Sequence, residues 1–277
     1  MRDLRFALRQ LGRRPALTAA AILTLALGVG ANTAVFSVVR GVLLEPLPYS
    51  EPDRLVRVYD TRSHFPRFPL APAAFLDYRN LDLPLSEFAL FAVGNLQLAA
   101  DDRPEELTGM QVSREFFGVV GLEPVHGRGF TPEEEIFGNH RQVVLGHEFW
   151  LRRFEGDPNV LGTTLELSGR TFTVVGVAHP ELQSPGGSFR SVEHGESVDI
   201  WRPLVLGPDE QPRFQHYLNG IARLRDGVSL EQAQATMTAI AADVIEPYVP
   251  ADPEREPWTI TLVPLSDDIV GPARTAL

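Results

Sequence analysis

The sequence of 277 residues contains no cysteine and no lysine. Without cysteine there is no disulfide framework, no thiolate zinc site and no cysteine nucleophile. Without lysine there is no phosphate-cradling loop of the G-K-[ST] type, and Schiff-base and serine–lysine chemistry are excluded as well. All 25 basic residues are therefore arginines. Because 44% of the residues are hydrophobic, the chain can bury a core, and its length suits one or two globular domains.

Charge is distributed unevenly along the chain, whose formal net charge is −11. Residues 1–40 carry six arginines against Asp3, a balance of +5, which leaves −16 for the remainder. A basic N-terminal segment followed by an acidic remainder argues against a nucleic-acid-binding domain. It fits a chain that a membrane divides into two parts.

The longest uncharged stretch runs over residues 15–39, with arginines on both sides. A bilayer core of about 30 Å needs about 20 helical residues, so this stretch predicts a transmembrane helix. Small and polar residues within it would allow close packing of another helix, although small residues are common in membrane helices generally. The candidate packing residues are Gly28, Gly30, Ala31, Asn32 and Ala34.

Residues 1–14 place apolar side chains at i, i+3, i+4 and i+7, with arginines on the other side, which is typical of a basic amphipathic helix at a cytoplasmic membrane surface. The positive-inside rule then places the N-terminus in the cytoplasm and the main domain outside it. A cleaved signal peptide is the alternative. An uncharged stretch of 25 residues is long for a signal-peptide core of 7–15 residues, which favours an uncleaved anchor.

After a proline-rich linker over 40–54, the sequence alternates short strands and short helices. Strands are expected over 55–59, 88–93, 96–99, 106–112, 142–145, 165–167, 171–175, 198–201, 216–224 and 258–262. Helices are expected over 72–80, over 114–120 with Ser113 as the cap, over 148–154, and after a capping box at 229–232. The loop 184–188, rich in glycine and serine, is expected to be mobile. The pattern predicts an α+β fold with a β-rich insertion.

No motif for chemistry is complete. His147-Glu148 begins like H-E-x-x-H, but Leu151 stands where the second histidine should be. His140 and His194 have no ligand pattern around them. We therefore predict no catalytic, cofactor-binding or metal-binding residue, and no enzyme activity.

Three other acidic or glycine-rich runs do not indicate a binding site. The triplet Glu133-Glu134-Glu135 follows Thr131-Pro132 and fits the first turn of a helix better than a cation site. The runs 28–30 and 127–129 both lack the third glycine of a dinucleotide-binding loop.

Four runs together resemble the MacB/FtsX-type permeases of ABC transporters, and in particular the large duplicated permeases of Acidobacteria. They are residues 8–37, which contain LTLALGVGANTAVFS; 112–131, with VSREFF and GRGFT; 149–177, with DPNVLG and TVVGV; and 222–229, ARLRDGVS. The first resembles the family's first membrane helix, and the other three resemble its periplasmic core.

The resemblance implies a bacterial inner-membrane protein with a periplasmic domain of porter-like α/β units and an inserted, sabre-like β-rich subdomain. The expected divisions are 55–126 and 206–265 for the porter-like parts, 127–205 for the insertion and 266–277 for the return to the membrane. It also implies a homodimer in the lipid bilayer, a separate or fused ATPase, a periplasmic adaptor and no cofactor. The function implied is ATPase-driven export or the transmission of force across the envelope.

Family permeases continue into three more membrane helices, so we expect this sequence to be the N-terminal portion of a permease. Two alternatives stay open: a single-pass, membrane-anchored binding or sensor domain, and a tethered hydrolase. The missing motifs disfavour the hydrolase, and 14 residues before the span are too few for a sensor output module.

Overall fold

The computed structural model describes residues 15–39, 47–62, 64–99, 104–206, 215–245 and 259–269. The chain divides into two compact units, Met1–Pro46 and Leu47–Leu277. The helix predicted over 1–14 and the return to the membrane beyond 269 lie outside the described residues.

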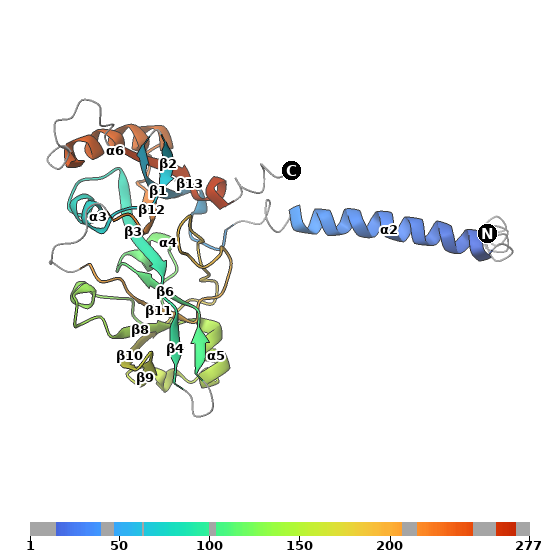
Figure 1. Cartoon of the computed structure of the whole chain (residues 1–277), viewed down its shortest axis with the longest axis horizontal. Helices are drawn as coiled ribbons and strands as arrows, with labels where there is room; N and C mark the ends of the chain where they lie inside the picture. The colour runs from blue at the N-terminus through green and yellow to red at the C-terminus, as the bar shows by residue number, and fades with distance from the viewer. Residues whose placement is uncertain are drawn as a thin grey trace. The chain divides into compact units, whose positions relative to one another are not determined.

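In the first unit, helix α2 spans Pro15–Val39 (Figure 1). Its first residue is a proline, which is tolerated there because its missing N–H would have no helical partner. The hydroxyls of Thr24 and Thr33 donate to backbone carbonyls one turn earlier, at 2.9 and 2.8 Å. By length and mean hydropathy, no helix in the described part of the chain qualifies as a membrane span. A helix is present over the predicted range, and its crossing of a bilayer stays a prediction.

The second unit is built on one mixed sheet. Its strands are β1 (Leu55–Arg62), β2 (Phe65–Phe68), β3 (Leu85–Val93), β4 (Leu96–Leu98), β5 (Glu105–Leu107), β6 (Gly109–Val112), β7 (His126–Gly127), β8 (Gln142–Leu145), β9 (Thr164–Leu167), β10 (Arg170–Val177), β11 (Ile200–Pro203), β12 (Asn219–Leu224) and β13 (Thr259–Pro264). The α-helices are α3 (Pro72–Arg79), α4 (Phe116–Val120), α5 (His147–Phe154) and α6 (Leu230–Ile245). Short 3₁₀ helices are η2 (Pro52–Arg54), η3 (Pro132–Glu135) and η4 (Pro158–Val160).

The described strands follow the order β13-β1-β12-β3-β6-β11-β8-β10-β9-β4-β5, with β2 beside β1 and β7 beside β10. The pairs β6–β11 and β8–β10 are parallel. The neighbours on either side of them, β3–β6 and β9–β10, are antiparallel. A mixed sheet covered by separate helices is the α+β architecture that the sequence predicts.

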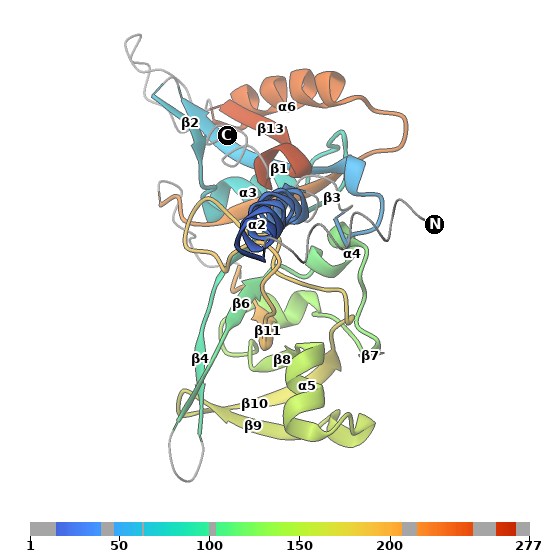
Figure 2. The same ribbon diagram turned by 90° about the vertical axis from the view of Figure 1, so that its right-hand side faces the viewer.

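Two of the three hydrophobic cores lie on opposite faces of this sheet. The α3/α6 core joins Leu90 of β3 and Ala222 of β12 to Met237 of α6. The central core contains Phe91 and Trp201. Because successive residues of a strand point to opposite faces, Leu90 and Phe91 assign these two cores to opposite sides. Figure 2 shows α6 beside β13 at one end of the sheet.

The third core includes residues of α5, the helix that lies at the other end of the sheet from α6 (Figure 2). It joins Val143 and Ile200 to Phe149 of the helix. Ile200 precedes Trp201, so the α5 core shares a face with the α3/α6 core. Between these two cores, the same face carries a polar row, Gln111 of β6 paired with Arg202 of β11.

Several elements form where local signals predict them. The Ser168-Gly169 turn between β9 and β10 has both φ angles positive, 49° and 70°, which matches the right-handed twist of a hairpin. The capping box of α6 is formed, since Ser229 and Gln232 exchange bonds at 3.0 and 3.2 Å. Helix α4 ends at Gly121, whose φ is 69°.

Several predicted boundaries were wrong, and three of them have a visible cause or a clear offset. The strand expected over 106–112 is two strands, because the N–H of Thr108 donates to the Asp199 carboxylate at 3.0 Å instead of to a neighbouring strand. Helix α4 starts at Phe116, and Ser113 does not cap it, since its Oγ accepts from the N–H of Leu90 at 3.1 Å. Strand β12 begins three residues later than expected, at Asn219.

The expected division into porter-like parts and an insertion at 127–205 stays a prediction. The described strands of all these ranges share one continuous sheet, and β8, β10 and β11 of the expected insertion pair directly with one another.

Candidate functional site

Within the described residues, no group of three or more His, Asp or Glu side chains is arranged to hold a metal ion. His140 is buried and stacks on Phe137, with ring centroids 5.3 Å apart. His147 is the first residue of α5, and the centroid of its ring lies 5.4 Å from that of Trp150. His194 is half-buried. Its pKa is lowered mainly by burial and, to a smaller extent, by the positive charge of Arg57.

The glutamate triplet has a structural role. As predicted, it forms a first turn, η3, in which Glu134 accepts from the N–H of Thr131 at 2.9 Å. Two of its side chains are nevertheless buried and form ion pairs that were not predicted from the sequence. Glu134 lies 2.7 Å from Arg128, and Glu135 lies 2.8 Å from Arg79 of α3. The triplet therefore joins η3 to the rest of the body.

The predicted packing residues of α2 are exposed where the structure describes their side chains. A methyl group added at Gly28 or Gly30 would meet nothing within 4 Å, and Asn32 is exposed. The side chains of Ala31 and Ala34 lie outside the described set. Packing of another helix on this surface stays a prediction.

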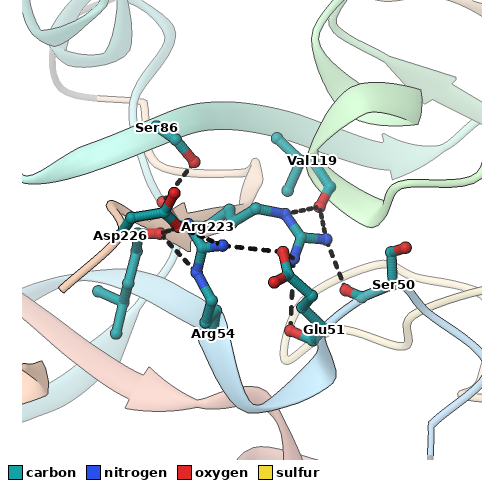
Figure 3. Close-up of polar contacts among 8 residues, drawn as sticks. Ser50, Glu51, Arg54, Ser86, Val119, Arg223 and Asp226 are labelled. Atoms are coloured by element: carbon teal, nitrogen blue, oxygen red, sulfur yellow. Dashed lines mark hydrogen bonds and ion pairs between the residues drawn. The ribbon is translucent and has the colours of Figure 1, made fainter. Parts of the chain in front are cut away.

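Buried arginines stand out where the chain enters the folded body. We call residues 47–54 the lead-in segment. Arg223 of β12 is 7% exposed, and its guanidinium holds this segment against α4 (Figure 3). Its Nε and Nη2 donate to the carbonyl of Val119 at 3.1 and 2.7 Å, and Nη2 also donates to the carbonyl of Ser50 at 2.7 Å. Nη1 donates to the carbonyl of Glu51 at 3.3 Å.

A second arginine ties the lead-in segment to the end of β12. Nε and Nη2 of Arg54 donate to the carbonyl of Leu224 at 3.1 and 2.6 Å. Its Nη1 pairs with Glu51 at 2.8 Å and with Asp226 at 2.6 Å, as Figure 3 shows. Glu51 and Asp226 are 63% and 89% exposed, so these ion pairs are screened and add little. The carbonyl bonds carry most of the attachment.

The backbone at this junction is tightly constrained. Ser50 donates its N–H to the carbonyl of Val120 at 3.1 Å. A methyl group added at Gly121 would lie 2.3 Å from the Cβ of Ser50, so only glycine allows this approach. Glu51 has a φ of 44°, a left-handed conformation that is uncommon outside glycine.

A matching cluster holds the last described residues, 265–269, which we call the closing segment. Arg57 of β1 is 2% exposed, and its Nε lies 3.2 Å from the carboxylate of Asp268. Tyr59 donates to the same carboxylate at 2.8 Å. Arg57 also lies over the ring of Phe91, 5.0 Å from its centroid.

The loop expected to be mobile is bound to this cluster. Arg57 donates through Nη2 to the carbonyls of Pro185 and Gly186. Ser184 is buried, and its Oγ donates to the carbonyl of Val192 at 2.9 Å while it accepts from the N–H of Gly186 at 3.1 Å. The loop is irregular, as predicted, but it is held in place by buried contacts.

The two segments pack into one core. Tyr49 of the lead-in segment and Leu265 of the closing segment are both buried members of the central core. Leu47 and Ile269 pack against the same core. The segments through which the chain enters and closes the body therefore share one rigid block.

The electrostatics of these clusters favour attachment over chemistry. Burial lowers the pKa of Arg57, and Asp268 partly offsets this by stabilising the charge. Burial, reinforced by Asp268, raises the pKa of Tyr59 to about 12, so its phenol stays protonated and donates. Arg223 also has a pKa lowered mainly by burial. A protonated phenol and donating guanidinium groups offer no nucleophile or base.

The sequence patterns did not predict the roles of Arg57 and Arg223 in binding the lead-in and closing segments. Each stands among apolar residues in a predicted strand, as in Leu55-Val56-Arg57-Val58-Tyr59. An arginine at that position in a central strand is a signal of a buried charge with partners. What it binds depends on segments far away in the sequence.

Comparison with known proteins bears on the whole body. A family described as MacB-like periplasmic core domain matches residues 18–240. The fold is similar to the periplasmic region of MacB from Actinobacillus actinomycetemcomitans, with a TM-score of 0.54, 15% identity, and coverage of 83% of this chain and 97% of that one. It is also similar to a domain assigned to a permease protein of Porphyromonas gingivalis, with a TM-score of 0.53, 18% identity, and coverage of 78% and 92%. At these identities the two structures support the fold alone. No curated protein matches the sequence.

Proposed function

The chain belongs to the family of the MacB-like periplasmic core domain of ABC-transporter permeases, and from this premise we propose that its body passes force between the membrane and the envelope. In this proposal α2 crosses the bacterial inner membrane with its N-terminus in the cytoplasm, and the body lies outside. An ATPase subunit or domain outside this chain supplies the work. The chain acts in export or in mechanical signalling, and it is not an enzyme.

One observation carries this proposal. The lead-in and closing segments both pack into the central core, and buried arginines of the sheet bind them: Arg223 donates to the carbonyls of Ser50 and Glu51, and Arg57 pairs with the carboxylate of Asp268. Because a packed core deforms little, a displacement of either segment moves the sheet as a unit. A binding module would not need its connections fixed in this way.

The proposed partners follow from the family. They are the lipid bilayer around α2, the ATPase, a second copy of the permease and a periplasmic adaptor. The residues Gly28, Gly30, Ala31, Asn32 and Ala34 are proposed as the surface on which another membrane helix packs.

The orientation can be tested by cysteine labelling, since the native chain has no cysteine. Glu123→Cys places a thiol at an exposed position of the body, and Arg5→Cys places one before α2. A membrane-impermeant maleimide applied to spheroplasts is expected to label the first variant at once and the second only after lysis. Labelling of Arg5→Cys in intact spheroplasts, with Glu123→Cys protected, would overturn the orientation.

Force transmission can be tested by pulling the full chain through tags at its two ends in optical tweezers. The native body is expected to rupture without prior release of the lead-in segment. Arg223→Met should add an early step of roughly 28 Å, the extended length of the eight residues 47–54 at about 3.5 Å each. The exposed Arg153→Met serves as the control. An early step already present in the native chain would contradict a fixed lead-in segment.

A further inference from the structure

A cavity of about 370 Å³ opens on the body, and its lining residues belong to neither the lead-in nor the closing segment. Ala92, Leu204 and Val205 give it apolar walls, and Gln111, Arg190 and Tyr217 contribute polar groups. A concave, mostly apolar space of this size with a few converging polar groups is typical of a small-molecule site.

Ala92 and Gln111 of the sheet line the cavity. Ala92 pairs with Gln111, and Gln111 pairs with Arg202, so all three project from one face and Arg202 lies next to the cavity lining, on the far side of Gln111 from Ala92. The guanidinium of Arg202 lies beside the Gln111 side chain above Gly94. A methyl group added at Gly94 would lie 2.9 Å from Cγ of Gln111 and 3.1 Å from Nε of Arg202. The glycine therefore makes room for the arginine.

The two arginines of this region lack countercharges. Within the described residues, neither Arg190 nor Arg202 has a carboxylate partner, and Nε of Arg202 is buried without a hydrogen bond. Burial and the charge of Arg170 both lower the pKa of Arg202, as expected for a charge without compensation. The chain has 36 acidic residues to pair with 25 arginines, so acids are not scarce.

The backbone of Arg190 is in the left-handed region, with a φ of 36°. Its carbonyl accepts from the N–H of Val93 at 3.0 Å, which fixes the residue at the rim of the cavity. Glycine would adopt this conformation without strain. An exposed arginine in a strained conformation beside a cavity indicates that its side chain is needed there.

From this geometry we propose that the cavity binds a small anion with an apolar body, such as an aryl or alkyl phosphate or carboxylate. Arg190, which lines the cavity, supplies the countercharge directly, and Arg202, next to Gln111, adds positive charge from outside the lining. Gln111 and Tyr217 supply neutral hydrogen bonds, and the apolar walls take the hydrocarbon part. The proposal does not depend on coupling to an ATPase, so it can fail or succeed separately from the proposed function.

The test is titration calorimetry of the full chain in detergent with phenyl phosphate, and with benzyl alcohol as the uncharged control. Phenyl phosphate is expected to bind and benzyl alcohol is not. Arg190→Gly should weaken binding about tenfold, the effect of losing one charge-assisted bond. Arg202→Met should weaken it by a smaller factor, because Arg202 acts through its charge from outside the lining. Arg153→Met, which removes the same charge at an exposed position on α5, should leave binding unchanged.

Arg190→Gly also separates a binding role from a structural one. Because glycine relieves the left-handed strain, the variant should keep or raise its unfolding temperature while it loses binding. Val205→Trp fills the cavity with both arginines intact, and it should abolish binding. Equal binding of the two compounds, or native affinity in Arg190→Gly and Arg202→Met, would overturn the proposal. Displacement of phenyl phosphate by dihexanoyl phosphatidate, or its failure, separates a lipid source of the ligand from a soluble one.

Discussion

Arg223 and Arg202 are both arginines in central strands of one sheet, yet their surroundings differ. Arg223 directs its donors to the carbonyls of Val119, Ser50 and Glu51, and it fixes the lead-in segment. Arg202 has no carboxylate partner in the described part of the chain, and it lies beside Gln111, which lines the cavity. A buried charge that is fully bonded stabilises its surroundings, whereas one without partners costs free energy. We infer that the first was selected for attachment and the second for a ligand.

The difference follows the two faces of the sheet. Ile221 belongs to the central core, and Arg223, two residues later, points to the same face. Arg57, two residues after the central-core residue Leu55, does so as well. Arg202 points to the opposite face, between the α3/α6 and α5 cores. The attachment arginines therefore lie on one side of the sheet, and Gln111 and Arg202 lie on the other.

The largest expected effect comes from Arg57→Leu. The substitution removes the buried guanidinium from Asp268, which keeps the Tyr59 hydroxyl and the more exposed Arg67, and it leaves the carbonyls of residues 185 and 186 without this donor. Loss of one partner of a buried ion pair costs about 3–5 kcal/mol. For a body of this size, thermal unfolding should occur roughly 6–20 °C lower. Arg153→Leu is the exposed control. A loss below about 1 kcal/mol would mean that Asp268 is compensated by solvent.

Arg223→Met should follow, with a loss of about 2–3 kcal/mol in the free energy of unfolding, because several carbonyls lose their donor at once. The matched control is Arg225→Met, two residues along. Among the described residues, the ion-pair partner of Arg225 is Asp82, which is 89% exposed, so loss of Arg225 should cost less than about 1 kcal/mol. Equal costs in urea unfolding of the two variants would remove the distinction between buried and surface arginines.

Alkaline pH should weaken the closing segment by a smaller amount. Burial raises the pKa of Tyr59 from 10.0 to about 12, so with rising pH the unfolded chain loses this proton first. The contribution is complete below pH 10 and is lost between about pH 10 and 12, by at most about 2.7 kcal/mol for two pKa units. Urea midpoints measured from pH 9.5 to 12 should fall less steeply in Tyr59→Phe. Parallel curves would argue against a role of this phenol.

The smallest effect is expected for Arg202→Met, and this variant tests the comparison between Arg202 and Arg223 most directly. Arg202→Met should change the free energy of unfolding by less than about 1 kcal/mol, or raise it, because methionine needs no countercharge. Arg223→Met, the same substitution on the attachment side, should be clearly destabilising under identical conditions. If Arg202→Met costs 2 kcal/mol or more in urea unfolding, Arg202 has a structural partner and the two arginines are alike.

Much of the fold could be predicted because its signals are local. The capping box at Ser229 and Gln232, the Ser168-Gly169 turn and the start of α3 at Pro72 each depend on a few adjacent residues. The errors occur where a distant residue intervenes. Thr108 leaves the strand because of Asp199, 91 residues away, and Ser113 binds Leu90 instead of capping α4.

The candidate site could be predicted only in part. That Arg223 lies in a strand followed from its apolar neighbours, but its partners Ser50 and Val119 are 173 and 104 residues away. The glutamate triplet was correctly placed in a first turn, yet its pairing with Arg79 depends on how α3 packs. Periodicity assigns a residue to an element, and it does not reveal which remote segment covers that element.

The strand order also has a consequence for how the body is made. β1 pairs with β12 and β13, and the contact of Thr61 with Thr261 joins residues 200 positions apart. During synthesis and export, β1 and β3 must therefore wait with open edges until β12 emerges, because β12 lies between them. Open edges invite pairing with other chains. Biogenesis of this protein should thus depend on holdase chaperones outside the membrane, and folding should be slow, as is usual for a topology of high contact order.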